Sequence, residues 1–285
     1  MAVDSLLLAV DFNHAFVESA STVRKIASAD LGSEFSLIPA AIKSVRALSL
    51  SRSRHVRDAR PSVGELRQAE LDCSRRCANQ ALRQAGIEIP RKLSAQSESK
   101  CIVGLGGHDS DRSPNWPPGF VGSLSHSERW VWAAVAKQHE ILSIGLDTSV
   151  IVNVGQAAPT LEENCNAAQR QKLYDVGLTA NQACTLLSSA KETFYRYWFP
   201  LLQRCWDFSD IELVAITPRQ TGPIPAQRDL RHGTLQLRLK STFSPGLALP
   251  DYLCPTAPLT VHYQIENPDV FTIAWQRNHA GDGSF

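Results

Sequence analysis

The chain has 285 residues, of which 43% are hydrophobic and 20% are charged, and its formal net charge at pH 7 is +1. This composition excludes a disordered or collagen-like chain, and the small net charge gives no general reason to bind nucleic acid or an anionic membrane. No apolar run reaches the roughly 18 residues that cross a bilayer, and the first residues carry Asp4 and Asp11 without the basic region of a signal peptide. We therefore expect a soluble, cytoplasmic, globular protein, and the seven scattered cysteines favour the same compartment because reduced thiols suit it.

A basic run lies between residues 43 and 60, where six lysines and arginines are opposed only by Asp58. One interpretation is a solvated loop, and the other is a landing site for an anionic ligand or an acidic protein. Both interpretations stay open. A nucleic-acid or polyanion-binding module is disfavoured, because the run contains no aromatic residue and the whole chain is close to neutral.

The clearest predicted helix spans residues 62–86, where apolar side chains recur on one face at helical spacing. Ser62 starts a capping-box pattern, and Gly86 ends the helix. Cys73 and Cys77 lie one turn apart on the apolar face, without a second CxxC or HxxxH pair. They are therefore predicted to be core residues and not zinc ligands.

The remaining pattern predicts mainly strands, with one further helix. A short strand at residues 100–105 precedes a loop rich in glycine and proline. The elements that follow are strands 130–136 and 141–146, a helix over about 178–202, and strands 211–217, 234–240, 260–265 and 270–276. A helix followed by strands thus occurs once before about residue 140 and once after it. We expect two α+β halves, residues 1–140 and 141–285.

The first chemically suggestive stretch covers residues 112–127, in which three prolines precede a Gly-Ser-Leu-Ser-His segment. Fixed φ angles at the prolines lower the entropy cost of holding nearby donors in place. Arg112, Ser125 and His126 are candidate donors to a phosphate. On its own, this stretch is more typical of a proline-rich surface loop at the mouth of a strand.

Two other stretches each present an acidic residue in a defined setting. Asp147 follows the apolar strand 141–146, where a carboxylate serves either as a metal ligand or, more commonly, as a cap on the next turn. Glu192 lies in the second helix with Arg196 four residues on, so the two share a face and form, at the simplest, an ion pair. Neither stretch alone identifies a site.

Taken together and in this order, three stretches resemble motifs of the 4′-phosphopantetheinyl transferases of the enterobactin and surfactin synthetase type. They are WPPGFVGSLSH, GLDTS and LSSAKETFYR, and the segment ELDCSRRCANQAL resembles a helix of the family, with Arg75 at its arginine. The resemblance covers roughly residues 60 to 217. It implies an α+β fold of two similar, pseudo-symmetric halves, each a small, mostly antiparallel sheet packed with helices, with the coenzyme in the cleft between them.

The resemblance also implies an activity: Mg²⁺-dependent transfer of the 4′-phosphopantetheine arm of coenzyme A to a serine of an acyl or peptidyl carrier protein. It assigns Asp147 and Glu192 to the metal, and Glu192 and Lys191 to catalysis. The residues that it places at the phosphates of coenzyme A are Arg75, Arg112, Ser125, His126, Lys191 and Arg196. Coenzyme A and the carrier protein are then the expected partners, and neither nucleic acid nor a membrane is expected. The resemblance also implies a monomeric enzyme of secondary metabolism.

Three positions depart from the pattern of the family. Ser149 stands at the second acid of the metal motif, Gln169 at a glutamate proposed as the base, and Leu187 at an aromatic position. A serine hydroxyl is a neutral ligand, and a glutamine accepts no proton at ordinary pH. Glu162 or Glu163 would replace the base only if their loop is rearranged. The alternative to an active transferase is a diverged paralogue that keeps the coenzyme and carrier-arm cleft but has lost or changed the chemistry.

Overall fold

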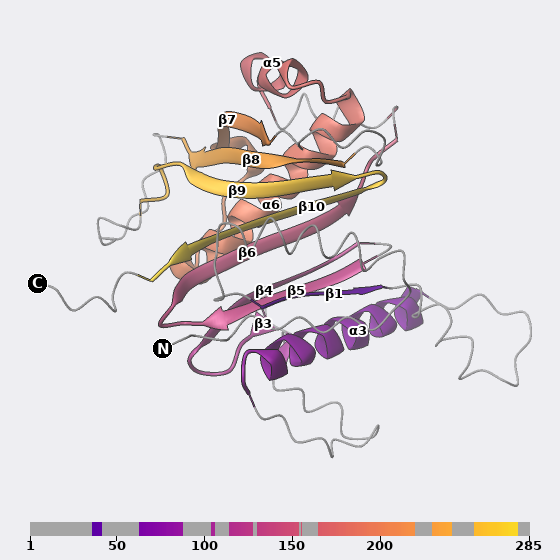
Figure 1. Cartoon of the computed structure of the whole chain (residues 1–285), viewed down its shortest axis with the longest axis vertical. Coiled ribbons are helices and arrows are strands. Elements are labelled where there is room, and N and C mark those ends of the chain that lie inside the picture. The colour runs from indigo at the N-terminus through magenta and orange to yellow at the C-terminus, as the bar shows by residue number, and fades with distance from the viewer. Residues whose placement is uncertain are drawn as a thin grey trace, which may run out of the picture. The chain divides into compact units, whose positions relative to one another are not determined.

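The computed structural model describes residues 36–41, 63–87, 104–105, 114–127, 130–153, 155, 165–219, 230–240 and 254–278. The chain divides into two compact units, Met1–Leu142 with Arg277–Phe285 and Ser143–Gln276 (Figure 1). Several predictions fall outside the described residues: those on Arg112, on the basic run between residues 43 and 60, and on Glu162 and Glu163.

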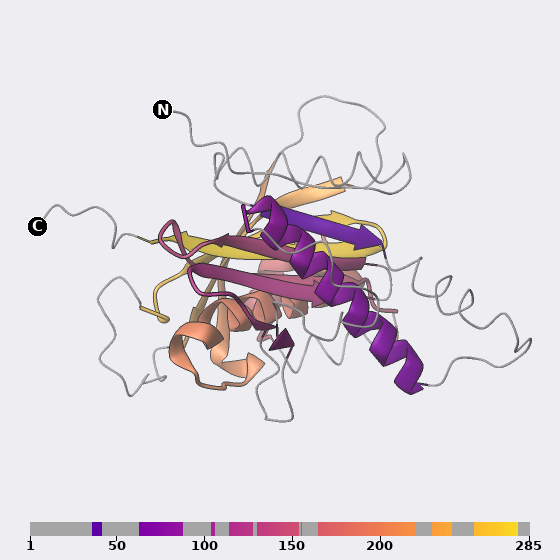
Figure 2. The same ribbon diagram turned by 90° about the horizontal axis from the view of Figure 1, so that it is seen from below.

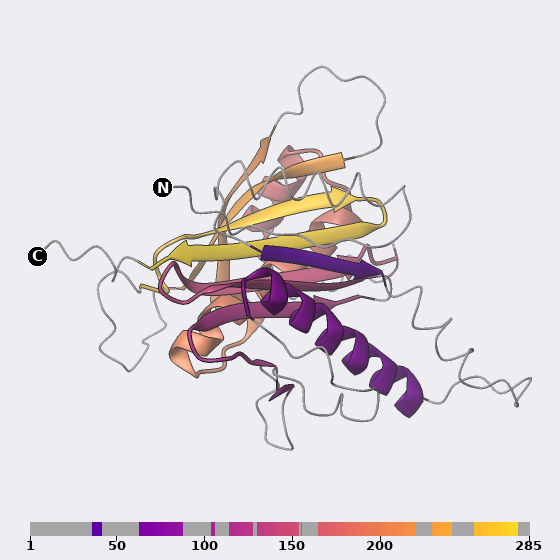
Figure 3. The ribbon, with the colours of Figure 1, turned by 60° about the horizontal axis from the view of Figure 1, so that its bottom comes forward.

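The first unit is built on a three-stranded sheet in the order β1-β5-β4, in which β5 pairs antiparallel with both neighbours. Helix α3 packs against β5, and β2 and β3 form a small antiparallel ladder (Figure 3). The elements are β1 (Ser36–Ala41), α3 (Val63–Gln84), β2 (Gly104–Leu105), β3 (Pro114–Asn115), β4 (Phe120–His126) and β5 (Trp130–Lys137). The predicted helix over 62–86 and the predicted strand over 130–136 are confirmed.

The core of the first unit forms between the apolar face of α3 and β5. Cys73, Cys77 and Ala81 are buried there, as the helical spacing predicts. The Cys77 thiol donates to the carbonyl oxygen of Val131 on β5 at 3.8 Å. Gly86 follows the helix with a φ of 94°, in the left-handed region that glycine adopts without strain. Both cysteines are therefore core residues.

Strand β4 corrects the expectation of a loop in the first motif. Ser123 and Ser125 are buried within this strand. A Cβ atom at Gly122 would lie 2.7 Å from the ring of Trp116, so the indole lies directly against the strand backbone. The alternation of apolar and polar residues that marks a strand is hidden here. Prolines precede the strand, and glycine and serine occupy positions where an apolar residue is usual.

The second unit is a five-stranded sheet in the order β6-β10-β9-β8-β7, with helix α6 against it (Figure 2). The pairs β7–β8, β8–β9 and β9–β10 are antiparallel. The elements are β6 (Ile141–Val150), α5 (Ala167–Asp175), α6 (Ala180–Leu202), the 3₁₀ helix η2 (Phe208–Asp210), β7 (Ile211–Arg219), β8 (Leu230–Leu239), β9 (Leu259–Glu266) and β10 (Asp269–Arg277). The predicted strands of this region are confirmed, and so is the α+β class.

Helix α6 begins at a cap that its sequence provides and ends at Leu202, two residues past Pro200. Thr179 and Gln182 form a capping box at its start. Pro200 lies within the last turn, and the left-handed residue Gln203 follows the end of the helix. The apolar face of α6 includes Leu187 and Phe194, which pack in the core against the sheet. The predicted helix is therefore confirmed, with its end at Leu202.

Helix α5 is not among the elements that the sequence predicts. It carries only two buried residues, Gln169 and Leu173, so no apolar stripe marks it as a helix. Asn166 caps its start by accepting a hydrogen bond from the backbone N–H of Gln169 at 2.9 Å. Neither α5 nor any other helix in the described part of the chain is long and apolar enough to cross a membrane.

Candidate active site

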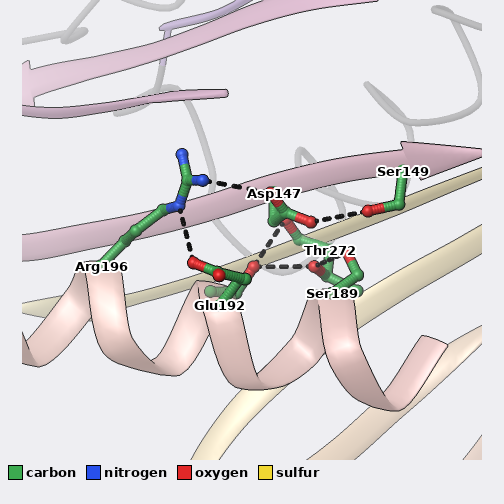
Figure 4. Close-up of polar contacts among 7 residues, drawn as sticks. Asp147, Ser149, Ser189, Glu192, Arg196 and Thr272 are labelled. Atoms are coloured by element: carbon green, nitrogen blue, oxygen red, sulfur yellow. Dashed lines mark hydrogen bonds and ion pairs between the residues drawn. The ribbon is translucent and has the colours of Figure 1, made fainter. Parts of the chain in front are cut away.

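Two carboxylates that are distant in sequence meet at one arginine in the second unit (Figure 4). Arg196 Nη2 lies 3.4 Å from Asp147 Oδ1, and Arg196 Nε lies 3.6 Å from Glu192 Oε2. Asp147 comes from β6, whereas Glu192 and Arg196 lie one turn apart on α6. The two acids that the resemblance assigns to the metal are therefore side by side around one guanidinium group.

The backbones of β6 and α6 come into contact next to these acids. A Cβ atom at Gly145 would lie 2.0 Å from the carbonyl oxygen of Thr193 and 2.7 Å from the backbone nitrogen of Tyr197. On the same strand, the Ser143 hydroxyl donates to the carbonyl oxygen of Tyr197 at 2.7 Å. Only glycine leaves room for this approach, which brings the helix close enough for Glu192 to stand near Asp147.

A buried group of hydroxyls joins α6 to β10 beside the acids (Figure 4). Thr272 Oγ1 lies 2.8 Å from Ser189 Oγ and 2.7 Å from Thr193 Oγ1. All three residues are buried, so the hydroxyls satisfy one another in place of water. The sequence did not predict this group. Its only signal is Ser189 and Thr193 at i,i+4 on a face of α6 that is otherwise apolar.

The charges of the site influence the protonation of Glu192. Partial burial raises the pKa of the Glu192 carboxyl, and the nearby Asp147 carboxylate raises it further, while Arg196 lowers it. The side chain of Glu192 is 42% exposed, whereas that of Asp147 is only 7% exposed. The two acids thus repel each other, and a cation between them relieves the repulsion.

Ser149 contacts the charged residues of the site through Asp147. Its hydroxyl donates to Asp147 Oδ2 at 3.0 Å, while Arg196 faces Oδ1. The residue at the second acidic position of the motif therefore orients the first acid and adds no negative charge. Among the described residues, no cluster of three or more His, Cys, Asp and Glu side chains is placed to hold a metal. The donor set nevertheless fits Mg²⁺, which often binds one or two carboxylates and completes its coordination with water and substrate phosphates.

Lys191 occupies a different environment from its neighbour Glu192. Its side chain is fully buried, and its ammonium group donates to the carbonyl oxygen of Phe208 at 2.6 Å. Burial lowers the pKa of Lys191 to about 8, with smaller effects from Cys165 and Asp210, which raise it, and from Lys240, which lowers it. The ammonium group thus lies inside the unit, against η2, and its assignment to phosphates and catalysis stays a prediction.

The lowered pKa of Lys191 predicts a pH-dependent stability. The pKa is about 8 in the folded protein against an ordinary value of 10.5, so between these values only the unfolded chain keeps the proton. The free energy of unfolding should therefore rise with pH in this window, by at most about 1.4 kcal/mol per pH unit, and this contribution is constant below it. Denaturant titrations from pH 7 to 10 with a metal chelator should show this rise for the wild type relative to Lys191→Met. Parallel profiles of the two proteins would contradict the prediction.

Three of the residues that the resemblance places at the phosphates of coenzyme A are described in the first unit. Arg75 is half-buried on α3, Ser125 is buried on β4, and His126 is exposed at the end of the same strand. Ser125 and His126 pair in register with Trp132 and Val131 of β5. Their contact with phosphates stays a prediction.

Gln169, at the position of the expected base, is buried on α5. Its side-chain oxygen is buried and finds no hydrogen-bond partner in the described part of the chain. A neutral amide in this place takes up no proton. The structure therefore gives Gln169 no role as a base, in agreement with its chemistry.

A family model and several curated proteins that are similar to this chain all indicate the same family. The family model of the 4′-phosphopantetheinyl transferase N-terminal domain matches residues 55–136. Enterobactin synthase component D of Escherichia coli (strain K12) is 31% identical over 134 residues, 47% of this chain and 56% of the relative. The 4′-phosphopantetheinyl transferase PptT of Mycobacterium tuberculosis is 29% identical over 150 residues, 52% of this chain and 58% of the relative. The 4′-phosphopantetheinyl transferase Svp of Streptomyces mobaraensis is 34% identical over 110 residues, 37% of this chain and 43% of the relative.

The chain spans about half the length of the curated relatives that it matches. The matched domain contains α3, β4 and most of β5, where the first motif and Arg75 lie. The α+β architecture, with antiparallel strand pairs in both units, agrees with the fold that the motifs imply. Residues 55–136 thus match the N-terminal domain of the 4′-phosphopantetheinyl transferases, and the chain is similar to members of that superfamily over about half of its length.

Proposed function

We propose that this protein transfers the 4′-phosphopantetheine arm of coenzyme A to a serine hydroxyl of an acyl or peptidyl carrier protein, with release of 3′,5′-ADP. The observation that carries the proposal is the meeting of Asp147 and Glu192 around Arg196. Two carboxylates and a guanidinium are the groups needed to bind a divalent cation and a phosphate next to each other. Similarity to the 4′-phosphopantetheinyl transferases supports the reaction type.

In this proposal each side chain has a defined task. Asp147 and Glu192 would hold Mg²⁺, which neutralises negative charge on the pyrophosphate when bound. Arg196 would bind a phosphate oxygen and keep the scissile group in position. The serine oxygen of the carrier forms the new bond to phosphorus as the bond to the bridging oxygen of the pyrophosphate breaks. The residues proposed for the phosphates at the nucleotide end are Arg75, Arg112, Ser125 and His126.

The proton of the attacking serine needs an acceptor other than Gln169. Glu192 is the candidate, because its carboxylate has a second oxygen beside the one that would face the metal and its side chain is 42% exposed. Lys191 would act on the reaction only if its ammonium group left the carbonyl oxygen of Phe208. We propose further that the enzyme is a cytoplasmic monomer that serves secondary metabolism.

The test is phosphopantetheinylation of purified apo-carriers, with fatty-acid, polyketide and peptide carriers tried in parallel. With coenzyme A and Mg²⁺, we expect at least one carrier to gain the mass of one phosphopantetheine arm, and a chelator to prevent the gain. No gain on any carrier would contradict the proposal. Tight coenzyme A binding in calorimetry without transfer would then identify the protein as the diverged paralogue.

A further inference from the structure

Arg196 contacts both acids of the site at the same time. It uses two nitrogens of one planar group, Nη2 toward Asp147 at 3.4 Å and Nε toward Glu192 at 3.6 Å (Figure 4). The guanidinium therefore lies beside both carboxylates, in the region that a metal bound to both of them would share. The partial exposure of Arg196 and Glu192 leaves this region accessible to solvent ions.

The guanidinium group of Arg196 can give up its two carboxylate partners for another anion. Their distances exceed the 2.7–2.9 Å that is typical of charge-assisted hydrogen bonds, and the Arg196 side chain is 33% exposed. Asp147 is largely buried, but the Arg196–Glu192 pair is partly exposed on both sides, and such pairs contribute little to stability, so a competing partner can replace it. A phosphate is such a partner, because the guanidinium fork matches its oxygens.

We propose that Arg196 is a competing cation that keeps divalent ions from the Asp147–Glu192 pair until a phosphate-bearing ligand draws its guanidinium away. With Arg196 in place, the three side chains carry a net charge of −1, and without it they carry −2. A divalent ion at the acids is repelled by a positive charge a few ångströms away, which lowers its affinity by about tenfold or more. Metal binding is thereby coupled to phosphate binding.

This inference rests on the metal site of the proposed function, but its test needs neither coenzyme nor carrier. Mn²⁺ is titrated into the full chain, and free Mn²⁺ is followed by electron paramagnetic resonance. We expect Arg196→Gln to bind Mn²⁺ about tenfold more tightly than the wild type, because the competing charge is lost. Arg196→Lys, which keeps the charge, should stay within about threefold of the wild type, and adding Glu192→Gln to Arg196→Gln should remove the gain.

Arg238→Gln is the matched control, because Arg238 pairs with Glu212 at 2.9 Å elsewhere in the same unit. Its Mn²⁺ affinity should equal that of the wild type. An unchanged or weaker affinity of Arg196→Gln, or an equal gain in Arg238→Gln, would overturn the proposal. The absence of Mn²⁺ binding in every variant would overturn it together with the metal site, whereas failed transfer with the expected affinities would count against the proposed function alone.

A second measurement is made on the wild type, and a variant serves only to assign the signal. The Arg196 Nε–H signal in a nitrogen-15 spectrum, assigned by its loss in Arg196→Lys, should shift as Mg²⁺ is added, because the ion displaces the guanidinium. We expect pyrophosphate alone to shift the same signal. A signal that stays unchanged at saturating Mg²⁺ would contradict the competition.

Discussion

Replacing Glu192 with glutamine should lower the rate of phosphopantetheine transfer by about 100-fold or more. The variant keeps the shape of the side chain but removes one of the two carboxylates around Arg196. It also removes the proposed proton acceptor, so both tasks of the residue are lost at once. For comparison, changes to residues that only support a metal ligand commonly cost 10–100-fold in activity or metal affinity. The measurement is the initial rate of mass gain on the carrier, at saturating Mg²⁺.

Glu212→Gln is the control for this change. Glu212 also pairs with an arginine on the second unit, Arg238, and its side chain is 33% exposed, close to the 42% of Glu192. Loss of an exposed ion pair has little effect on stability, so this variant should transfer at the wild-type rate within about twofold. A Glu192→Gln variant as active as Glu212→Gln would remove Glu192 from the site.

The sequence predicts one half of the candidate site better than the other. Glu192 and Arg196 are four residues apart on a helix, and this local geometry makes their contact predictable from periodicity alone. Asp147 meets them only through the packing of β6 on α6, which no local pattern reveals. Only the resemblance to a family predicted that Asp147 and Glu192 lie at the same site.

Other features escaped prediction because their signals are weak or non-local. Strand β4 (Phe120–His126) places serine and glycine at positions that usually carry apolar residues, and α5 (Ala167–Asp175) has only two buried side chains. The hydroxyls around Thr272 pair residues from two distant elements. Apolar alternation, by contrast, identified the strands of the second unit, since their inward positions face the leucine-rich core.

Gly145→Ala tests whether the contact between β6 and α6 assembles the site. The added methyl group would lie 2.0 Å from the carbonyl oxygen of Thr193, and neither backbone is free to rotate away as a flexible side chain would. We expect the free energy of unfolding to fall by about 3 kcal/mol, at the upper end of ordinary overpacking costs. Transfer should fall at least tenfold even where the variant is folded, because Thr193 is next to Glu192 and Gly145 is two residues from Asp147. Denaturant unfolding and the carrier assay measure the two effects separately.

Gly155→Ala is the matched control, because a Cβ atom at Gly155 would meet no heavy atom within 4 Å. This variant should be as stable as the wild type or slightly more stable, since alanine restricts the unfolded chain more than glycine does. If Gly145→Ala matched it in both stability and transfer rate, the close approach of the two backbones would not be what brings the acids together. A loss of transfer in Gly145→Ala with restored activity at high Mn²⁺ would instead show that the separated acids still bind the ion, only more weakly.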